Sequence, residues 1–120
     1  MSNIHPQKEL ALIVPILKGK VKDVEQLAAS LSSSKSEEYG KSQMGLGIEK
    51  ESWFLASSVQ GDYVIVYIES NDVSKSMSKL ISSKEPFDLW IKNEVGKITG
   101  VDWNNPPSMA LPKQILRYGP

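Results

Sequence analysis

The sequence contains no cysteine, a single histidine (His5) and a single arginine (Arg117). The absence of cysteine excludes disulfides, thiol nucleophiles, iron–sulfur clusters and thiolate zinc sites. Lysine plus arginine and aspartate plus glutamate balance at 14 each, so the chain has no net charge that would attract a polyanion. We therefore expect no nucleic acid among its main partners.

Long apolar runs are also lacking. The longest, residues 10–17, is far shorter than the roughly 18 apolar residues needed to span a bilayer. The first ten residues lack the apolar stretch of a signal peptide, so we expect a cytoplasmic protein that has no membrane partner. At 120 residues the chain predicts one domain over residues 1–120, beginning with a flexible tail over residues 1–7.

Hydrophobic periodicity predicts the secondary structure. Residues 9–17 form an apolar run of strand length, which predicts a central strand covered on both faces. Helical spacing predicts a helix over residues 21–31 and a second, short helix that Ser34 and Glu37 would cap. This second helix would end at Gly45 or Gly47, with Tyr39 and Gln43 on one of its sides. Two further helices are expected, one capped by Asp72 and one running from Pro86 to Gly100.

Residues 52–70 predict a β-hairpin with a tight turn at Gln60 and Gly61. This turn would pair Ser58 with Tyr63, Ala56 with Ile65, and Phe54 with Tyr67. The second strand is apolar on both of its faces. One face carries Tyr63, Ile65 and Tyr67; the other carries Val64, Val66 and Ile68. Either face could meet a partner, and we expect the tyrosine face to do so.

Residues 113–119 predict a final strand, which completes the order strand, helix, strand, strand, helix, strand. This order is typical of an α+β, ferredoxin-like βαββαβ domain. Such a domain has a four-stranded antiparallel sheet with its helices packed on one face. The other face of the sheet is then bare, and a bare apolar face indicates an interface or a ligand site.

Three segments carry a resemblance to a known group of proteins. They are "GIEKESWFLASSVQGDYVIVYIESND", "EPFDLWIKNEV" and "ITGVDWNNPP". They are similar to segments of a family of small bacterial proteins with no assigned activity, within the dimeric α/β-barrel (ferredoxin-like) superfamily. The resemblance implies a homodimer in which two sheets pack face to face, and a pocket between each sheet and its helices.

The same superfamily includes cofactor-independent monooxygenases and haem-degrading enzymes, so the resemblance does not fix the activity. A haem-degrading enzyme of this fold would resemble others in using a histidine on a helix. The only histidine here, His5, lies in the polar N-terminal segment. We therefore expect no cofactor, and the residues leave open whether the chain is an enzyme.

Other candidate sites have simpler structural explanations. Five acidic residues are spread over turns, helix caps and loops without a metal-ligand spacing, so we expect no metal site. They are Asp62, Glu69, Asp72, Asp88 and Asp102. The serines between residues 30 and 36 lack a nucleophile motif, and "GKSQMGLG" lacks the spacing of a phosphate-binding loop. No catalytic residue is assigned.

Aromatic residues are the better candidates for a ligand site or an interface. Phe54, Tyr63, Ile65 and Tyr67 are expected on one face of the hairpin, and Trp103 is expected at the rim of a pocket. We expect a homodimeric binding or interaction module that takes a small apolar or aromatic ligand. The alternative is a monooxygenase-like enzyme that acts on a small aromatic substrate between sheet and helices.

Overall fold

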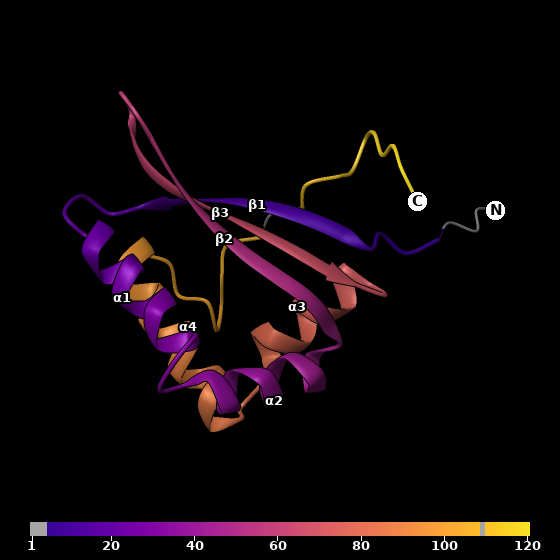
Figure 1. Cartoon of the computed structure of the whole chain (residues 1–120), viewed down its shortest axis with the longest axis horizontal. Helices are drawn as coiled ribbons and strands as arrows, with labels where there is room; N and C mark the ends of the chain where they lie inside the picture. Colours follow the sequence, from indigo (N-terminus) through magenta and orange to yellow (C-terminus); the bar gives the residue numbers. More distant parts are fainter. Residues whose placement is uncertain (1–4, 109) are drawn as a thin grey trace.

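The structure is a computed structural model that describes residues 5–108 and 110–120 (Figure 1). Its elements, in chain order, are β1 (Glu9–Ile16), α1 (Val21–Leu31), α2 (Ser36–Leu46), β2 (Ile48–Ser58), β3 (Gly61–Ser70), α3 (Val73–Ser82) and α4 (Pro86–Thr99). The predicted α+β class is confirmed. Residues 1–4 of the expected N-terminal tail lie outside the described residues.

The strands of the described chain form an antiparallel sheet in the order β1-β3-β2, so β3 is central and β1 is an edge strand. The prediction of β1 as a central strand covered on both faces is therefore wrong. Ala11, Ile13 and Pro15 point to one face and are exposed. An edge position also accommodates Pro15, which has no N–H to donate to a neighbouring strand.

The expected fourth strand is not present among the described residues, where residues 110–120 are irregular. This segment contacts the start of β1 through side chains instead. Gln114 Nε2 donates to Glu9 Oε1 at 2.6 Å, and Arg117 Nε donates to the same oxygen at 3.2 Å. These bonds hold the C-terminal segment on the side of the sheet away from the helices (Figure 1).

The hairpin of β2 and β3 is confirmed, but its register differs from the prediction by two residues. Ser58 pairs with Gly61, and Phe54 pairs with Ile65 rather than with Tyr67. The turn residues are therefore Val59 and Gln60, where the Ser58 hydroxyl accepts a hydrogen bond from Gln60 N at 3.1 Å. A shift of two residues leaves every side chain on its predicted face.

The four helices lie on one face of the sheet, as predicted (Figure 1). Asp72 caps α3 by accepting from Lys75 N at 3.1 Å, and Pro86 opens α4. Gly47 ends α2 with a φ of 79°, a left-handed conformation that favours glycine. The predicted capping box is wrong: α2 begins at Ser36, and no side chain caps its N-terminus.

The core divides into two clusters under separate helix pairs. One cluster contains Leu10, Leu46, Ile48, Ile68 and Val73. The other contains Ile16, Val24, Leu27, Val64 and Ile98. Val66, in the middle of β3, packs against both clusters. The centre of the sheet therefore lies between two groups of helices that do not share one continuous packed core.

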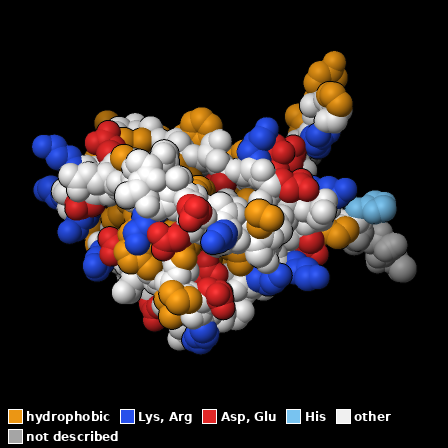
Figure 2. All heavy atoms as spheres, turned by 60° about the horizontal axis from the view of Figure 1, so that its bottom comes forward, with side chains coloured by type: hydrophobic (Ala, Val, Ile, Leu, Met, Phe, Trp, Pro, Cys, Tyr) orange, Lys and Arg blue, Asp and Glu red, His pale blue; other side chains and the backbone are white. Residues whose placement is uncertain are grey.

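The outer side of the helices is a mixed surface. Charged side chains of both signs are interspersed with small apolar groups over it (Figure 2). Such a pattern is typical of a solvated helical surface rather than of a large docking site. None of the helices in the described part of the chain is long and apolar enough to cross a membrane.

Candidate functional site

A cavity of about 120 Å³ lies between the sheet and the helices, where the two core clusters meet. Its floor is the centre of the sheet, including Leu12 and Val66, and its far wall includes Ile91 and Val95 of α4. The lining is almost entirely apolar. The cavity exists because two helix pairs each pack well at one end of the sheet and leave its middle less filled.

A β-bulge in β2 lies just before Glu51, one of the residues that line this cavity. Ile48 pairs with Ser70, but Lys50 already pairs with Glu69, so β2 contains one extra residue at Glu49. The extra residue changes the alternation of the strand, and such bulges re-aim the side chains that follow them. As a result Ile48, Glu51 and Trp53 all face the helices and line the cavity.

Glu51 forms a polar cluster at the wall of the cavity. Its Oε1 accepts from Gln43 Nε2 and its Oε2 accepts from Trp53 Nε1, each at 2.7 Å. Gln43 Nε2 also lies 3.5 Å from the hydroxyl of Tyr39. Burial, and then the negative charge of Glu51, raises the pKa of Tyr39 far above its ordinary value of 10, so the hydroxyl keeps its proton.

A second polar network ties the helices together beside the cavity. Asp88 is 4% exposed and accepts from Ser42 and from Ser83, whose Oγ lies 2.6 Å from Asp88 Oδ2. Lys92, 3% exposed, donates to the carbonyls of Ile81 and Ser83 at 3.0 and 2.9 Å.

These bonds explain why two charged side chains are buried at that position. Lys92 satisfies carbonyls at the C-terminal end of α3, where a positive charge is favourable. Burial lowers the pKa of Lys92 from its ordinary value. Asp88 links α4 to α2 through Ser42, so the network fixes the position of three helices around the cavity.

Aromatic side chains connect α2 with α4. The rings of Tyr39 and Phe87 are 6.2 Å apart, and those of Phe87 and Trp90 are 5.5 Å apart, both in tilted arrangements. Tilted contacts at these separations are favourable for aromatic pairs. Tyr39 and Phe87 belong to the cavity lining, so this row gives the cavity a flat apolar wall.

Trp103 is the one predicted site residue that lines the cavity. It follows α4 in the loop after Gly100, and its Nε1 donates to Thr99 Oγ1 at 3.0 Å. This bond folds the loop back onto the end of α4. Trp103 therefore lies in the wall of this cavity, and its role in a ligand site stays a prediction.

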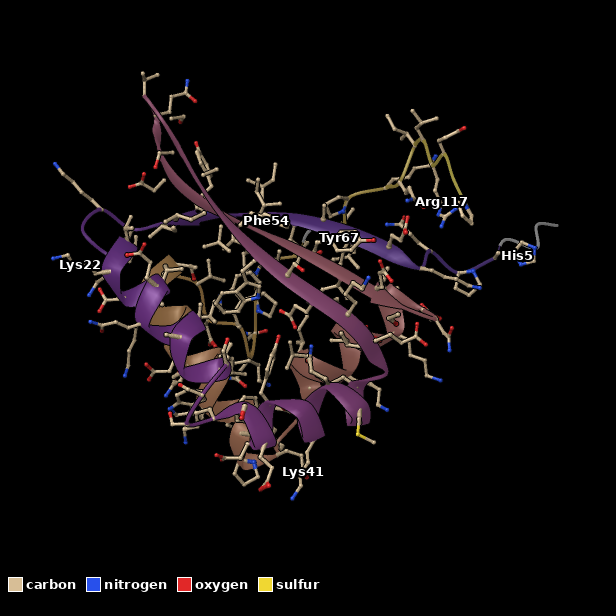
Figure 3. The ribbon with its side chains drawn as sticks, viewed as in Figure 1. His5, Lys22, Lys41, Phe54, Tyr67 and Arg117 are labelled. Atoms are coloured by element: carbon tan, nitrogen blue, oxygen red, sulfur yellow. The ribbon has the colours of Figure 1, made fainter. Side chains whose placement is uncertain are left out.

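Phe54, Tyr63, Ile65 and Tyr67 lie together on the other face of the sheet, away from the cavity. We call this face the open face. Figure 3 shows Phe54 projecting from the sheet on the side opposite the helices. At its centre Ile65 pairs with Ile13 on one side and with Phe54 on the other, and these two neighbours are 66% and 55% exposed.

The tyrosines of the open face do not reach the cavity. The hydroxyl of Tyr67 lies 2.7 Å from Glu69 Oε2 and 3.2 Å from Glu9 Oε2. The hydrogen bond to Glu69 raises the pKa of Tyr67 above its ordinary value. The structure therefore separates the predicted site residues into four on the open face and one, Trp103, at the cavity.

The remaining candidates lie apart from the cavity. His5 is exposed beyond the start of β1 (Figure 3). Asp72 caps α3, and Asp88 belongs to the buried network. Within residues 5–108 and 110–120, no three histidine or acidic side chains gather closely enough to hold a metal ion.

Sequence reasoning missed the polar cluster of Tyr39, Gln43 and Glu51. Part of the signal was present, because helical spacing placed Tyr39 and Gln43 on one side of α2. Strand alternation also puts Glu51 on the same face as Trp53. What the sequence did not indicate is that α2 lies against this part of β2.

Comparisons with known proteins do not assign the chain to a family. No protein-family model matches the chain, and neither a curated protein nor a solved structure matches it. Function is therefore inferred from the cavity and from the two faces of the sheet.

Proposed function

We propose that this protein is a homodimeric binding module that holds a small, largely apolar ligand in the cavity between its sheet and its helices. The observation that supports this most is the apolar cavity itself, with one hydrogen-bonding cluster in its wall. Ligand sites are typically concave and apolar, with a few polar groups that fix orientation.

The size of the cavity limits the ligand. An engineered protein cavity of about 150 Å³ with an apolar lining stays dry and binds benzene. The present cavity, at about 120 Å³, is of similar size. A single small ring is therefore the largest rigid ligand that we expect without movement of the helices.

Binding of toluene tests the proposal. We expect toluene to bind with a 1:1 stoichiometry per chain, measured by calorimetry or NMR titration. Val66→Trp, which replaces a side chain at the cavity floor by a larger one, is expected to abolish the binding. Val59→Trp is the matched control, because Val59 lies fully exposed at the hairpin turn. Absence of toluene binding to the unmodified protein would contradict the proposal.

The dimer is proposed to form through the open face, giving the dimeric α/β barrel that the sequence resemblance implies. Support comes from the row of Ile13, Ile65 and Phe54, whose outer two side chains are exposed, since an apolar surface across three paired strands is costly to leave in water. The balanced net charge adds little repulsion between copies.

Sedimentation of the protein and of Ile13→Glu tests the dimer. We expect a dimer for the unmodified chain and a folded monomer for the variant, because Ile13 is an exposed edge-strand residue whose replacement leaves the core intact. Glu49→Lys, also an exposed change in a strand, is the control and is expected to remain dimeric. A monomeric unmodified protein at micromolar concentration would refute the dimer.

A cofactor-independent monooxygenase remains the second candidate function, and one observation favours it. Glu51 places a carboxylate, a possible proton acceptor, at the wall of an apolar cavity. Tyr63 and Tyr67, the hydroxyl groups expected for such a site, point to the open face instead. Oxygen uptake in the presence of a bound phenol, compared with Glu51→Gln, distinguishes an enzyme from a binding module.

A further inference from the structure

We propose that Glu51 determines which ligand the cavity takes, and that this ligand is a neutral small ring carrying one O–H or N–H donor. The inference rests on the proposed binding function and specifies it. Its basis is the way in which the carboxylate is held at the cavity wall.

The carboxylate of Glu51 has acceptor capacity to spare. Two bonds come from neutral donors, the amide of Gln43 and the indole of Trp53, one to each oxygen. A carboxylate offers about four acceptor positions, and the Tyr39 hydroxyl also bonds to Glu51, so about one remains. None of the ion pairs among the described residues includes Glu51, so no cation competes for this position.

The hydroxyl of Tyr39 takes only one acceptor position of Glu51, so a position is left for a ligand. Gln43 already donates to Glu51 and lies at the long distance of 3.5 Å from the Tyr39 oxygen. An uncharged donor that enters the cavity would therefore find a carboxylate acceptor whose other contacts are fixed. Hydrogen bonds to charged groups are stronger than those between neutral groups.

The rest of the lining favours a neutral ring. Apart from the Glu51 cluster, Ser42 and Lys92, the cavity is bounded by aliphatic and aromatic groups, including the flat side chains of Tyr39, Phe87 and Trp103. An anionic ligand would be repelled by Glu51. A cationic ligand would share the cavity with Lys92, whose side chain also lines it. A neutral ring with one donor avoids both conflicts.

Phenol and toluene form the test pair, because they have nearly the same shape and differ in one hydrogen-bond donor. We measure the dissociation constants of both for the unmodified protein, for Glu51→Gln and for the control Glu49→Gln. Glu49 is an exposed neighbour that does not line the cavity. We compare the ratio of the dissociation constant of toluene to that of phenol, because effects common to both ligands cancel in this ratio. We expect this ratio to fall roughly tenfold in Glu51→Gln and to stay unchanged in Glu49→Gln.

A measurement on the unmodified protein keeps the test valid if Glu51→Gln does not fold. Phenol is expected to shift the NMR resonance of the Trp53 indole N–H, which donates to Glu51, more than toluene does. Equal shifts, or an unchanged ratio in a folded Glu51→Gln, would overturn the role of Glu51 while leaving the binding function intact. Failure of both ligands to bind would overturn the binding function itself.

Discussion

Both faces of the sheet carry apolar or aromatic side chains on β3, but the two faces have different surroundings. Val64, Val66 and Ile68 lie under the helices, where Val64 and Ile68 are buried and Val66 lines a cavity. Tyr63 and Ile65 lie on the open face, beside the exposed side chains of Ile13 and Phe54. An apolar side chain on a strand therefore indicates that the residue favours burial, but it does not indicate whether helices or a partner chain will cover it.

The polar groups on the two faces differ in the same way. On the helical face, Glu51, Asp88 and Lys92 are each held by two hydrogen bonds within a largely apolar region. On the open face, Glu9 meets the C-terminal segment at an exposed edge. Charged groups on the helical face are therefore fixed by hydrogen bonds within the protein, whereas those on the open face make contacts at the surface.

The largest expected difference in the free energy of unfolding is between a substitution in the core and one on the open face. Ile68→Ala removes a side chain that is 3% exposed and should lower the free energy of unfolding by about 2–5 kcal/mol. Ile13→Ala, on the open face, should change it by about 0.5 kcal/mol or less in dilute solution, where dimerisation contributes least. Urea denaturation of both variants measures the difference, and equal losses would mean that the open face is covered within one chain.

The next comparison concerns two lysines of α4. Lys92→Met leaves the carbonyls of Ile81 and Ser83 without their donor and should cost about 1–3 kcal/mol of stability. Lys97→Met removes an exposed bond to Glu94 at 3.1 Å and should cost about 0.5 kcal/mol or less. Thermal and urea unfolding of the pair provide the measurement. A neutral effect of Lys92→Met would show that water replaces the lost donor.

The smallest expected effect is a pH-dependent contact at the edge of the open face. The hydrogen bond from Gln114 lowers the pKa of Glu9 below its ordinary value of 4.5; burial opposes this, and Tyr67 and Arg117 add to it. A lowered pKa means that the folded state binds the proton less strongly. The contribution to stability is therefore complete above the ordinary pKa and is lost as the pH falls through the lowered one.

Amide hydrogen exchange of residues 113–120 checks this contact. We expect protection of Gln114 N, which donates to Gln7 Oε1 at 3.1 Å, to decrease as acid protonates Glu9. Exchange rates must be corrected for their intrinsic pH dependence. Glu9→Gln should remove the pH-dependent part of the protection. Persistence of that part in Glu9→Gln would assign it to another group, such as Glu69, which shares the Tyr67 hydroxyl.

Local signals in the sequence predicted much of the fold. Asp72, Pro86, Gly47 and Gly100 mark helix ends in the structure, because each acts through its own side chain or backbone conformation. Strand alternation also assigned the faces of the hairpin correctly. The predicted fourth strand is not seen: residues 113–119 have strand-like composition, but in the described part of the chain they pair with no other strand.

The candidate site was less predictable than the fold. Glu51 faces the cavity by regular alternation with Trp53, but its partner Gln43 comes from a helix whose packing position the sequence did not specify. The predicted residues Phe54, Tyr63, Ile65 and Tyr67 were grouped correctly because they share a face. Their separation from Trp103 depends on three-dimensional packing, which periodicity in the sequence does not encode.

NMR mapping of toluene binding tests the central claim most directly, because it assigns the ligand to one face of the sheet. We predict saturable shifts of the amide and methyl resonances of Val66, Ile91 and Val95 at the cavity, with Ile13 and Phe54 unaffected. Shifts confined to Ile13, Ile65 and Phe54, or no saturable shift at any concentration that toluene reaches in water, would contradict the account.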